Sequence, residues 1–357
     1  MTEYYDWNKT LSYNADVTMV IGARGIGKTF GLRMQFIRDY INKGYRFFEL
    51  VRYKNELVDA TTGYFEKLAS FFPEYVFKSS KRFGYIAKKP EEYDGNERKL
   101  VWDKICYFGA MTEEQAIKKR SNSYVNCANI LFDEAVIDKR LDVYHNYLPN
   151  EYGILVSIVD SVTRERKDDN RKRKPKVFLL GNACDLMNVY FAAYNINKVP
   201  EYGYSWHKGK TMILHYVKDE IYSEEKTKHT VAGRMLEGTV DERISSGNEF
   251  IGFTNEFVKE KPKNAKFMFG LIYNNNRYGI WADYQCGYYH VTGKIPNNST
   301  NVYTLTVEDS RVNYIMAKKA TPILRSFFDL YYYGIIRYES PEIKARFNEV
   351  LAAFGIK

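Results

Sequence analysis

Cysteine and histidine, which supply most protein zinc sites, are scarce in this chain. It has four cysteines and five histidines among 357 residues, and Cys106, Cys127, Cys184 and Cys286 are scattered singly. There is no Cys-x-x-Cys pair and no two histidines at the spacing of a zinc site. The pattern excludes a zinc module and a disulfide framework, and it indicates a reducing, cytoplasmic compartment with buried thiols.

Long apolar runs are missing as well. No uninterrupted apolar stretch approaches the roughly 18 residues that a membrane-spanning helix needs. The first six residues read Met-Thr-Glu-Tyr-Tyr-Asp, with acids where a secretory signal has basic residues. We therefore expect neither membrane association nor secretion.

What the chain has in excess is positive charge and aromatic residues. Fifty-three Lys and Arg face 44 Asp and Glu, a net charge of +9, and 16% of the residues are aromatic. The charge suits a polyanionic partner without demanding one. The aromatics are more often core residues than ligand contacts. The length leaves room for one large or two modest domains.

The first 217 residues alternate between short apolar strands and helical stretches. A helical repeat over 30–40 separates the first two strands, and the pattern predicts an α/β domain with a mostly parallel sheet. The expected strands are 17–21, 46–51, 105–108, 129–132 and 177–180. The run 164–176 is charged throughout, so we expect it to be an exposed loop.

The amino-acid composition changes after residue 217. Residues 218–250 are polar with little apolar periodicity and are predicted to be a linker. Residues 251–357 form the expected second, smaller α+β domain. It begins with a β-meander over 266–273, 278–284 and 287–291, and it ends in an aromatic helical stretch over 322–354.

The strongest motif lies between the first strand and the first helix. It matches Gly-x-x-x-x-Gly-Lys-Thr in full, and its residues are Gly22, Ala23, Arg24, Gly25, Ile26, Gly27, Lys28 and Thr29. Glycines let successive backbone N–H groups face phosphate oxygens, and the helix N-terminus adds its dipole. The motif predicts that ATP binds here, with Lys28 on the β- and γ-phosphates and the Thr29 hydroxyl on Mg²⁺.

A second motif supplies the chemistry that a phosphate-binding loop lacks. The apolar strand 129–132 ends in Asp133 and Glu134. Asp133 is the expected Mg²⁺ ligand, and Glu134 is the expected base that polarises the attacking water. Together the two motifs predict an ATPase of the ASCE type, which has an additional strand between them and a catalytic glutamate.

Three further residues are candidates for completing the catalytic site. Asn182 follows the strand 177–180, where a polar side chain can sense the γ-phosphate, although a turn asparagine explains it equally well. Arg164, with Arg166 close by, and Arg120 are candidates for the cation that neutralises the transferring phosphoryl group from a neighbouring subunit. An exposed arginine is more often a solvated charge.

Several segments are similar to a known family. The run Val-Ile-Gly-Ala-Arg-Gly-Ile-Gly-Lys over 20–28 resembles the DNA-packaging ATPases, or encapsidation proteins, of small short-tailed bacteriophages. So do segments 51–57, 132–134, 146–151 and 301–306 and the order of the segments between them. The resemblance extends over nearly the whole chain.

The resemblance implies a homomeric ring, typically a pentamer, at the portal of a procapsid in the host cytoplasm, which drives double-stranded DNA inward with ATP. It implies an ASCE ATPase domain, a linker and a C-terminal domain related to RNase H-like nucleases. Arg164 falls on the family's trans-acting arginine-finger position, and Arg120 and Lys54 fall on basic positions. A structural RNA is a further candidate partner. The stretch 167–176 departs from the family pattern as an insertion.

The second domain lacks the acids of an active two-metal nuclease. Such sites need about three carboxylates, one of them on the first strand. The strand 267–273 has none; Asp283 lies in the second strand, and Glu308 and Asp309 come later, which is too little for a cluster. We therefore expect no nuclease activity. Four lysines form either a DNA-facing stripe or an ordinary solvated face: Lys259, Lys261, Lys263 and Lys266.

Two other functions fit the ATPase motifs. A cellular helicase or chromosome pump of the same superfamily would act without a capsid. A nucleotide-gated portal assembly factor would switch with ATP but translocate nothing, although the intact Lys28 and Glu134 argue against it.

Overall fold

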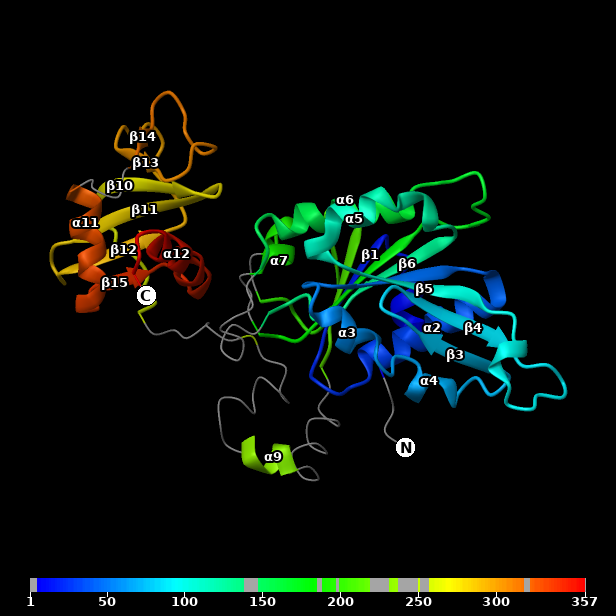
Figure 1. Cartoon of the computed structure of the whole chain (residues 1–357). Helices are drawn as coiled ribbons and strands as arrows, with labels where there is room; N and C mark the ends of the chain where they lie inside the picture. The colour runs from blue at the N-terminus through cyan, green and yellow to red at the C-terminus, as the bar shows by residue number, and fades with distance from the viewer. Residues whose placement is uncertain are drawn as a thin grey trace. The chain divides into compact units, whose positions relative to one another are not determined.

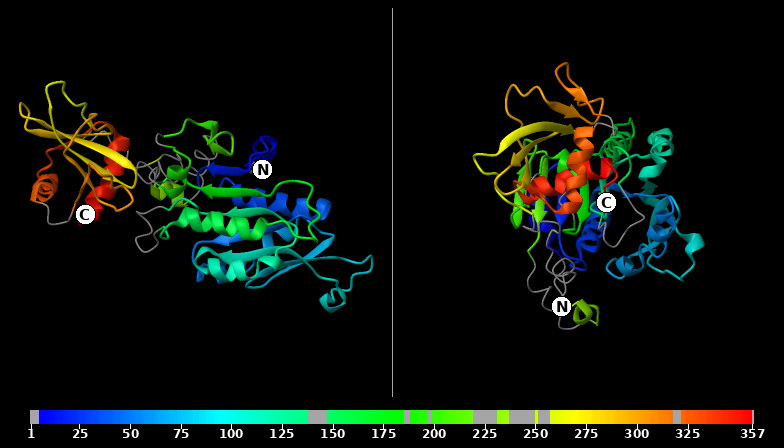
Figure 2. Two further views of the ribbon diagram at one scale, coloured as in Figure 1. Left: turned by 90° about the horizontal axis from the view of Figure 1, so that it is seen from above. Right: turned by 90° about the vertical axis from the view of Figure 1, so that its left-hand side faces the viewer.

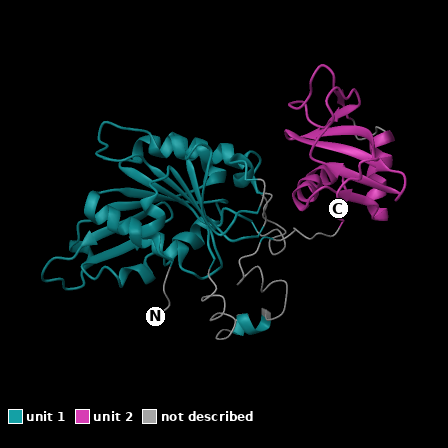
Figure 3. Cartoon of the chain, turned by 180° about the vertical axis from the view of Figure 1, so that it is seen from behind, with its two compact units in different colours: residues 1–250 teal, residues 251–357 magenta. Residues whose placement is uncertain are grey.

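A computed structural model describes residues 5–137, 147–184, 188–196, 199–218, 231–236, 250, 257–317 and 322–356. The chain divides into two compact units, Met1–Phe250 and Ile251–Lys357 (Figure 3). The linker expected over 218–250 lies mostly outside the described residues; helix α9 (Val231–Leu236) is described within it. No helix among the described residues has both the length and the apolarity to cross a bilayer.

The first unit is built on a nine-stranded sheet with the order β3-β4-β5-β2-β6-β7-β1-β9-β8. The six strands from β5 to β9 in this order are parallel, while β3, β4 and β8 pair antiparallel at the edges. The expected α/β domain with a mostly parallel sheet is therefore confirmed. The strands are β1 (Val17–Ile21), β2 (Arg46–Val51), β3 (Tyr75–Ser79), β4 (Phe83–Lys88), β5 (Asp103–Ala110), β6 (Cys127–Phe132), β7 (Lys176–Gly181), β8 (Gly203–His207) and β9 (Met212–Tyr216).

Strand β7 lies between β1, which leads into the glycine-rich loop, and β6, which ends before Asp133. This is the additional strand that the two motifs predict. Because the strands are parallel, the carboxyl ends of β1, β6 and β7 meet at one edge of the sheet. The register pairs Ile21 with Gly181 and Phe132 with Leu179, so the three polar loops that follow are neighbours.

Helices cover both faces of this sheet. Helix α2 (Lys28–Lys43) connects β1 to β2 and α6 (Glu151–Thr163) connects β6 to β7, in opposite directions along the sheet. Right-handed crossovers in opposite directions lie on opposite faces, and Figures 1 and 2 show this arrangement. The shorter helices are α1 (Trp7–Ser12), α3 (Glu56–Thr61), α4 (Glu66–Ala69), α5 (Glu114–Lys119) and α7 (Val189–Ala193), with 3₁₀ turns η1 (Glu97–Lys99), η2 (Met111–Glu113) and η3 (Ser121–Ser123).

The core of the first unit is largely aromatic between α2 and the sheet. Phe36 of α2 lies 5.2 Å from Phe47 of β2 and 5.3 Å from Phe178 of β7, measured between ring centroids. All three rings are buried. The packing fixes α2, and with it the glycine-rich loop, against the middle of the sheet.

The charged stretch 164–176 is not the fully exposed loop that its composition suggests. The side chains of Arg171 and Asp169 are each 5% exposed and form an ion pair at 2.8 Å. Arg171 also donates to the Cys127 carbonyl at 3.0 Å, and Arg166 donates to the Ser161 carbonyl at 2.8 Å. Backbone carbonyls at the end of α6 and the start of β6 accept these hydrogen bonds, which lets the Arg171 guanidinium be buried and the Arg166 side chain be partly buried.

The second unit is a six-stranded sheet with the order β14-β13-β10-β11-β12-β15. Its centre is the expected meander, β10 (Lys266–Tyr273), β11 (Asn276–Asp283) and β12 (Tyr288–Thr292), and parallel strands extend it on both sides. The remaining elements are β13 (Val302–Thr304), β14 (Ile315–Met316), α11 (Pro322–Asp329), η4 (Leu330–Tyr333), β15 (Ile336–Tyr338) and α12 (Pro341–Ala353). The stretch 322–354 is thus two helices separated by a strand, not a continuous helical region.

Candidate active site

The glycine-rich loop turns the chain from β1 into α2. Gly25 has φ of 92° and Gly27 has φ of 81°, a left-handed backbone that side chains rarely adopt. Gly27 is the N-cap residue of α2, and no side chain caps this helix end. The N–H groups of the first turn can therefore bind an anion.

Lys28 connects this loop to the neighbouring strand end. Its buried ammonium donates to the Gly22 carbonyl at 2.7 Å, to the Ala23 carbonyl at 2.8 Å and to Asn182 Oδ1 at 3.3 Å. The contact places Asn182, after β7, in the same site as the lysine of the glycine-rich motif. Its predicted sensing role stays a prediction.

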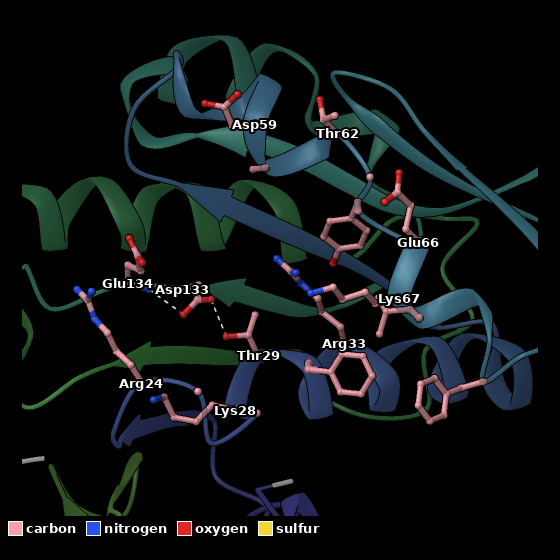
Figure 4. A pocket seen from close by; sticks show the side chains of 18 of the residues that line it. Arg24, Lys28, Thr29, Arg33, Asp59, Thr62, Glu66, Lys67, Asp133 and Glu134 are labelled. Carbon is pink, nitrogen blue, oxygen red and sulfur yellow. Dashed lines mark hydrogen bonds between the residues drawn. The ribbon is translucent and has the colours of Figure 1, made fainter. Parts of the chain in front are cut away.

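Thr29 and Asp133 meet across the site (Figure 4). The Thr29 hydroxyl donates to Asp133 Oδ2 at 2.6 Å, and the Glu134 amide donates to Asp133 Oδ1 at 2.9 Å. A hydroxyl and a carboxylate are oxygen ligands of the kind that Mg²⁺ prefers. The described residues contain no cluster of three or more His, Cys, Asp or Glu that could hold a metal. The Thr29 hydroxyl and the Asp133 carboxylate fit a Mg²⁺ ion whose other ligands are phosphate oxygens and water.

Glu134 has the surroundings of a proton acceptor. Burial raises the pKa of its carboxyl and the Asp133 carboxylate adds to the rise, while Arg24 and Arg52 oppose it. A raised pKa brings a carboxylate closer to the range in which it accepts a proton efficiently. The backbone of Glu134 has φ of 53°, an uncommon value for a residue other than glycine.

These groups line one cleft of about 990 Å³. Figure 4 shows Arg24 and Lys28 on one side of it and Asp59, Thr62 and Glu66 on the other. This far wall comes from α3, α4 and the turn between them, which the sequence pattern did not identify. A cleft of this size is in the range of small-molecule sites.

A partly buried ion pair contributes to the wall of the cleft. Arg33 of α2 donates from Nε to Glu49 Oε2 at 3.2 Å, Tyr64 donates to the same carboxylate, and the guanidinium lies 4.4 Å from the Tyr64 ring centroid. Although burial disfavours its charge, Glu49 raises the pKa of Arg33. The sequence carries one signal for this group, an acid within the buried strand β2.

Arg164 and Arg120 lie outside this cleft. Arg164 is the C-cap residue of α6 and pairs with Asp160 at 3.0 Å, and its side chain is 62% exposed. Arg120 donates from Nε to the Ala116 carbonyl at 3.1 Å. Helix α6 runs from the site edge of the sheet toward the start of β7, so it presents Arg164 at the opposite edge from Glu134. The structure therefore does not bring either arginine to Glu134 of the same chain.

Comparisons with known proteins point to one family. The model of the podovirus DNA encapsidation protein (Gp16) matches residues 1–354. The DNA packaging proteins of Bacillus phages PZA and phi29 are each 30% identical over 343 residues, which cover 96% of this chain and 95% of each relative. A chain of the bacteriophage phi-29 viral genome packaging motor assembly superposes with a TM-score of 0.72 at 26% identity, over 99% of both chains.

Proposed function

The chain belongs to the podovirus DNA encapsidation protein family, and from this premise we propose that it is the ATP-driven motor that moves double-stranded viral DNA into a procapsid. The observation that carries the proposal is one cleft that joins Lys28, the Thr29–Asp133 pair and Glu134. Relatives that share nearly its whole length are DNA packaging proteins.

The residues of the cleft have separable roles in ATP hydrolysis. The phosphates of ATP lie against the N-terminal turn of α2, where Lys28 exchanges the Gly22 and Ala23 carbonyls for phosphate oxygens. Thr29 and Asp133 would hold Mg²⁺, which when bound would neutralise charge on the phosphates. Glu134 accepts the proton of the attacking water, and Asn182, which contacts Lys28, reports the state of the γ-phosphate.

Arg164 completes the site of a neighbouring subunit. Its place at the far end of α6, exposed and away from its own cleft, supports action in trans within a homomeric ring. The phi-29 relative is part of a packaging motor assembly. We infer a ring, most simply a pentamer, that docks on the procapsid portal in the host cytoplasm. Portal contact and a structural RNA belong to the same proposal.

The second unit is proposed to be an RNase H-like domain without nuclease activity, joined by the linker 218–250. A three-stranded meander extended on the β10 side by parallel strands supports the relationship. Two of its acids have structural partners: Asp283 accepts from the Gln285 amide at 3.1 Å, and Asp309 accepts from the Asn275 amide at 2.9 Å. Carboxylates that cap turns in this way are less available as metal ligands.

ATP hydrolysis by the purified protein, with and without procapsids and duplex DNA, tests the proposal. Glu134→Gln should keep ATP binding and reduce turnover by at least about 10²-fold, the lower end expected for a lost general base. Glu66→Gln is the matched control, because Glu66 lines the same cleft without a catalytic role. It should turn over within about threefold of wild type.

The alternatives predict different dependences. A helicase or chromosome pump would hydrolyse ATP and act on DNA without procapsids. A portal assembly factor would bind the procapsid but protect no DNA. Hydrolysis that responds to neither DNA nor procapsids would contradict the packaging proposal.

A further inference from the structure

Arg52, which directly follows β2, forms a buried ion pair that the roles above do not use. Its side chain is 7% exposed, and its partner Glu151, the first residue of α6, is fully buried. Arg52 Nε donates to Glu151 Oε2 at 3.0 Å, and Nη2 donates to Oε1 at 3.1 Å. This is the bidentate geometry that arginine forms with a carboxylate and lysine cannot reproduce.

The rest of the guanidinium faces the loop of the proposed catalytic base. Nη1 and Nη2 each donate to the Glu134 carbonyl at 3.3 Å, and Nη2 also donates to the Ala135 carbonyl at 3.0 Å. The left-handed backbone of Glu134 needs such support, because few residues adopt it without external contacts. On the other side, the Ala135 amide donates to the Leu180 carbonyl of β7 at 2.8 Å.

The carboxylate of Glu151 has further hydrogen-bond donors around it. It accepts from the Tyr190 hydroxyl at 2.5 Å and from the Leu148 amide at 2.9 Å, besides its two bonds from Arg52. The rings of Phe132 and Tyr147 lie 5.1 and 5.5 Å from the Arg52 guanidinium. A buried pair of this kind adds little stability over apolar residues of the same size. A role in placing the loop that it contacts explains it better.

We propose that Arg52 is a positioning residue, which holds the Glu134 loop against the N-terminus of helix α6. The inference rests on the proposed ATPase function and assigns it a residue that does not touch the nucleotide cleft. Because α6 ends at Arg164, the same ion pair fixes the base of one site relative to the helix that carries the arginine for the next.

The reaction is sensitive to this placement. A general base must lie within hydrogen-bond reach of the water it activates. A misplacement of about 1 Å can cost about 10²-fold in rate. The residues that bind phosphate and Mg²⁺ are held by other contacts, so loss of the ion pair should affect turnover far more than nucleotide affinity.

The test replaces the pair without leaving a buried charge. Arg52→Met/Glu151→Gln removes both charges at similar volume. The introduced glutamine can still accept from the Leu148 amide through its oxygen, and its NH2 group can donate to the Tyr190 hydroxyl oxygen. Arg52→Lys keeps the positive charge but cannot form the bidentate hydrogen bonds of the guanidinium group. The matched control is Arg82→Met/Glu113→Gln, an ion pair of the same type whose residues do not line the cleft. Each full-length variant is measured for kcat, KM, binding of a fluorescent ATP analogue and urea unfolding.

We expect the Arg52→Met/Glu151→Gln variant to lose about 10- to 100-fold in kcat, with ATP-analogue affinity within about threefold of wild type. Arg52→Lys should fall between it and wild type, and the control pair should not change kcat. A kcat within threefold of wild type would overturn the proposal, as would parallel losses of kcat, affinity and folding in both Arg52 variants. If the Arg52→Met/Glu151→Gln variant does not fold, Arg52→Lys decides by the same criteria. If wild type hydrolyses no ATP, the proposed function itself fails.

Discussion

The proposed action of Arg164 in a neighbouring subunit can be tested with mixed rings. Arg164 lies at the far end of α6, which has 13 residues and is about 20 Å long at 1.5 Å per residue. An arginine side chain cannot span this distance to Glu134 of its own chain. Arg164→Ala should therefore inactivate the neighbour's site, by about 10³-fold or more if it acts as an arginine finger.

A subunit that lacks Arg164 still has its own Glu134, and a Glu134→Gln subunit still has its own Arg164. In a head-to-tail ring mixed at random from equal amounts of the two variants, about a quarter of the interfaces join an intact base to an intact arginine. We expect neither variant to hydrolyse ATP alone and the mixture to recover activity, up to about a quarter of wild type.

The assay is steady-state ATP hydrolysis at fixed total protein over a series of mixing ratios, with procapsids present. Recovery should be greatest near equal amounts. The control mixes Arg164→Ala with the double variant Lys28→Ala/Glu134→Gln, a subunit with neither an intact phosphate site nor an intact base, whose Arg164 should restore the same activity. An Arg164→Ala protein that keeps more than about a tenth of wild-type turnover would refute the reasoning.

Three further predictions follow from single features of the structure. Cys286 is exposed while Cys106, Cys127 and Cys184 are buried, and burial raises the pKa of Cys127 to about 12. Mass spectrometry should therefore find only Cys286 alkylated in the native protein. Modification of Cys127 without unfolding would contradict this. Burial, with a smaller effect of Lys9, lowers the pKa of His215 to about 4, so below about pH 6.5 the unfolded chain binds a proton at this side chain that the folded chain does not bind. Urea unfolding should therefore show that about 1–2 kcal/mol of unfolding free energy is lost between pH 7 and pH 4, after allowance for partial exposure. His215→Asn should remove most of this loss. A Cβ added at Gly279 would lie 2.2 Å from the Lys294 carbonyl oxygen. Gly279→Ala should therefore destabilise the second unit by about 2–3 kcal/mol, which amide hydrogen exchange would detect as faster exchange in its strands. Unchanged exchange would show that the backbone shifts to accommodate the methyl group at little cost.

Five of the six parallel strands of the central sheet were predicted from the sequence, because buried parallel strands are largely apolar; β9 (Met212–Tyr216) was missed. Strands β1, β2 and β7 are almost entirely buried, and their apolar runs predict them nearly to the residue. The edge strands β3 and β8 are mostly half-buried, with polar or aromatic residues at their exposed positions, and no apolar run marks them. Strand β15 has three residues within an aromatic segment, which is too short for a periodicity.

Some residues of the candidate site could be predicted from the sequence and others could not. Lys28, Thr29, Asp133 and Glu134 belong to contiguous motifs, so their residue types and spacing are enough to predict their chemistry. The Arg52–Glu151 pair joins residues 99 positions apart, and nothing local to either one names its partner.

The stretch 164–176 was mispredicted because composition does not show what accepts hydrogen bonds from a charged side chain. Arg171 is buried against the Cys127 carbonyl and Asp169, partners that only the folded chain brings to it.

The most direct test of the packaging account is the amount of duplex DNA that purified procapsids protect from nuclease when this protein and ATP are present. We predict protection with wild type that requires both ATP and procapsids and disappears with Glu134→Gln. Equal protection by wild type and Glu134→Gln, or none with an actively hydrolysing wild-type protein, would contradict the account.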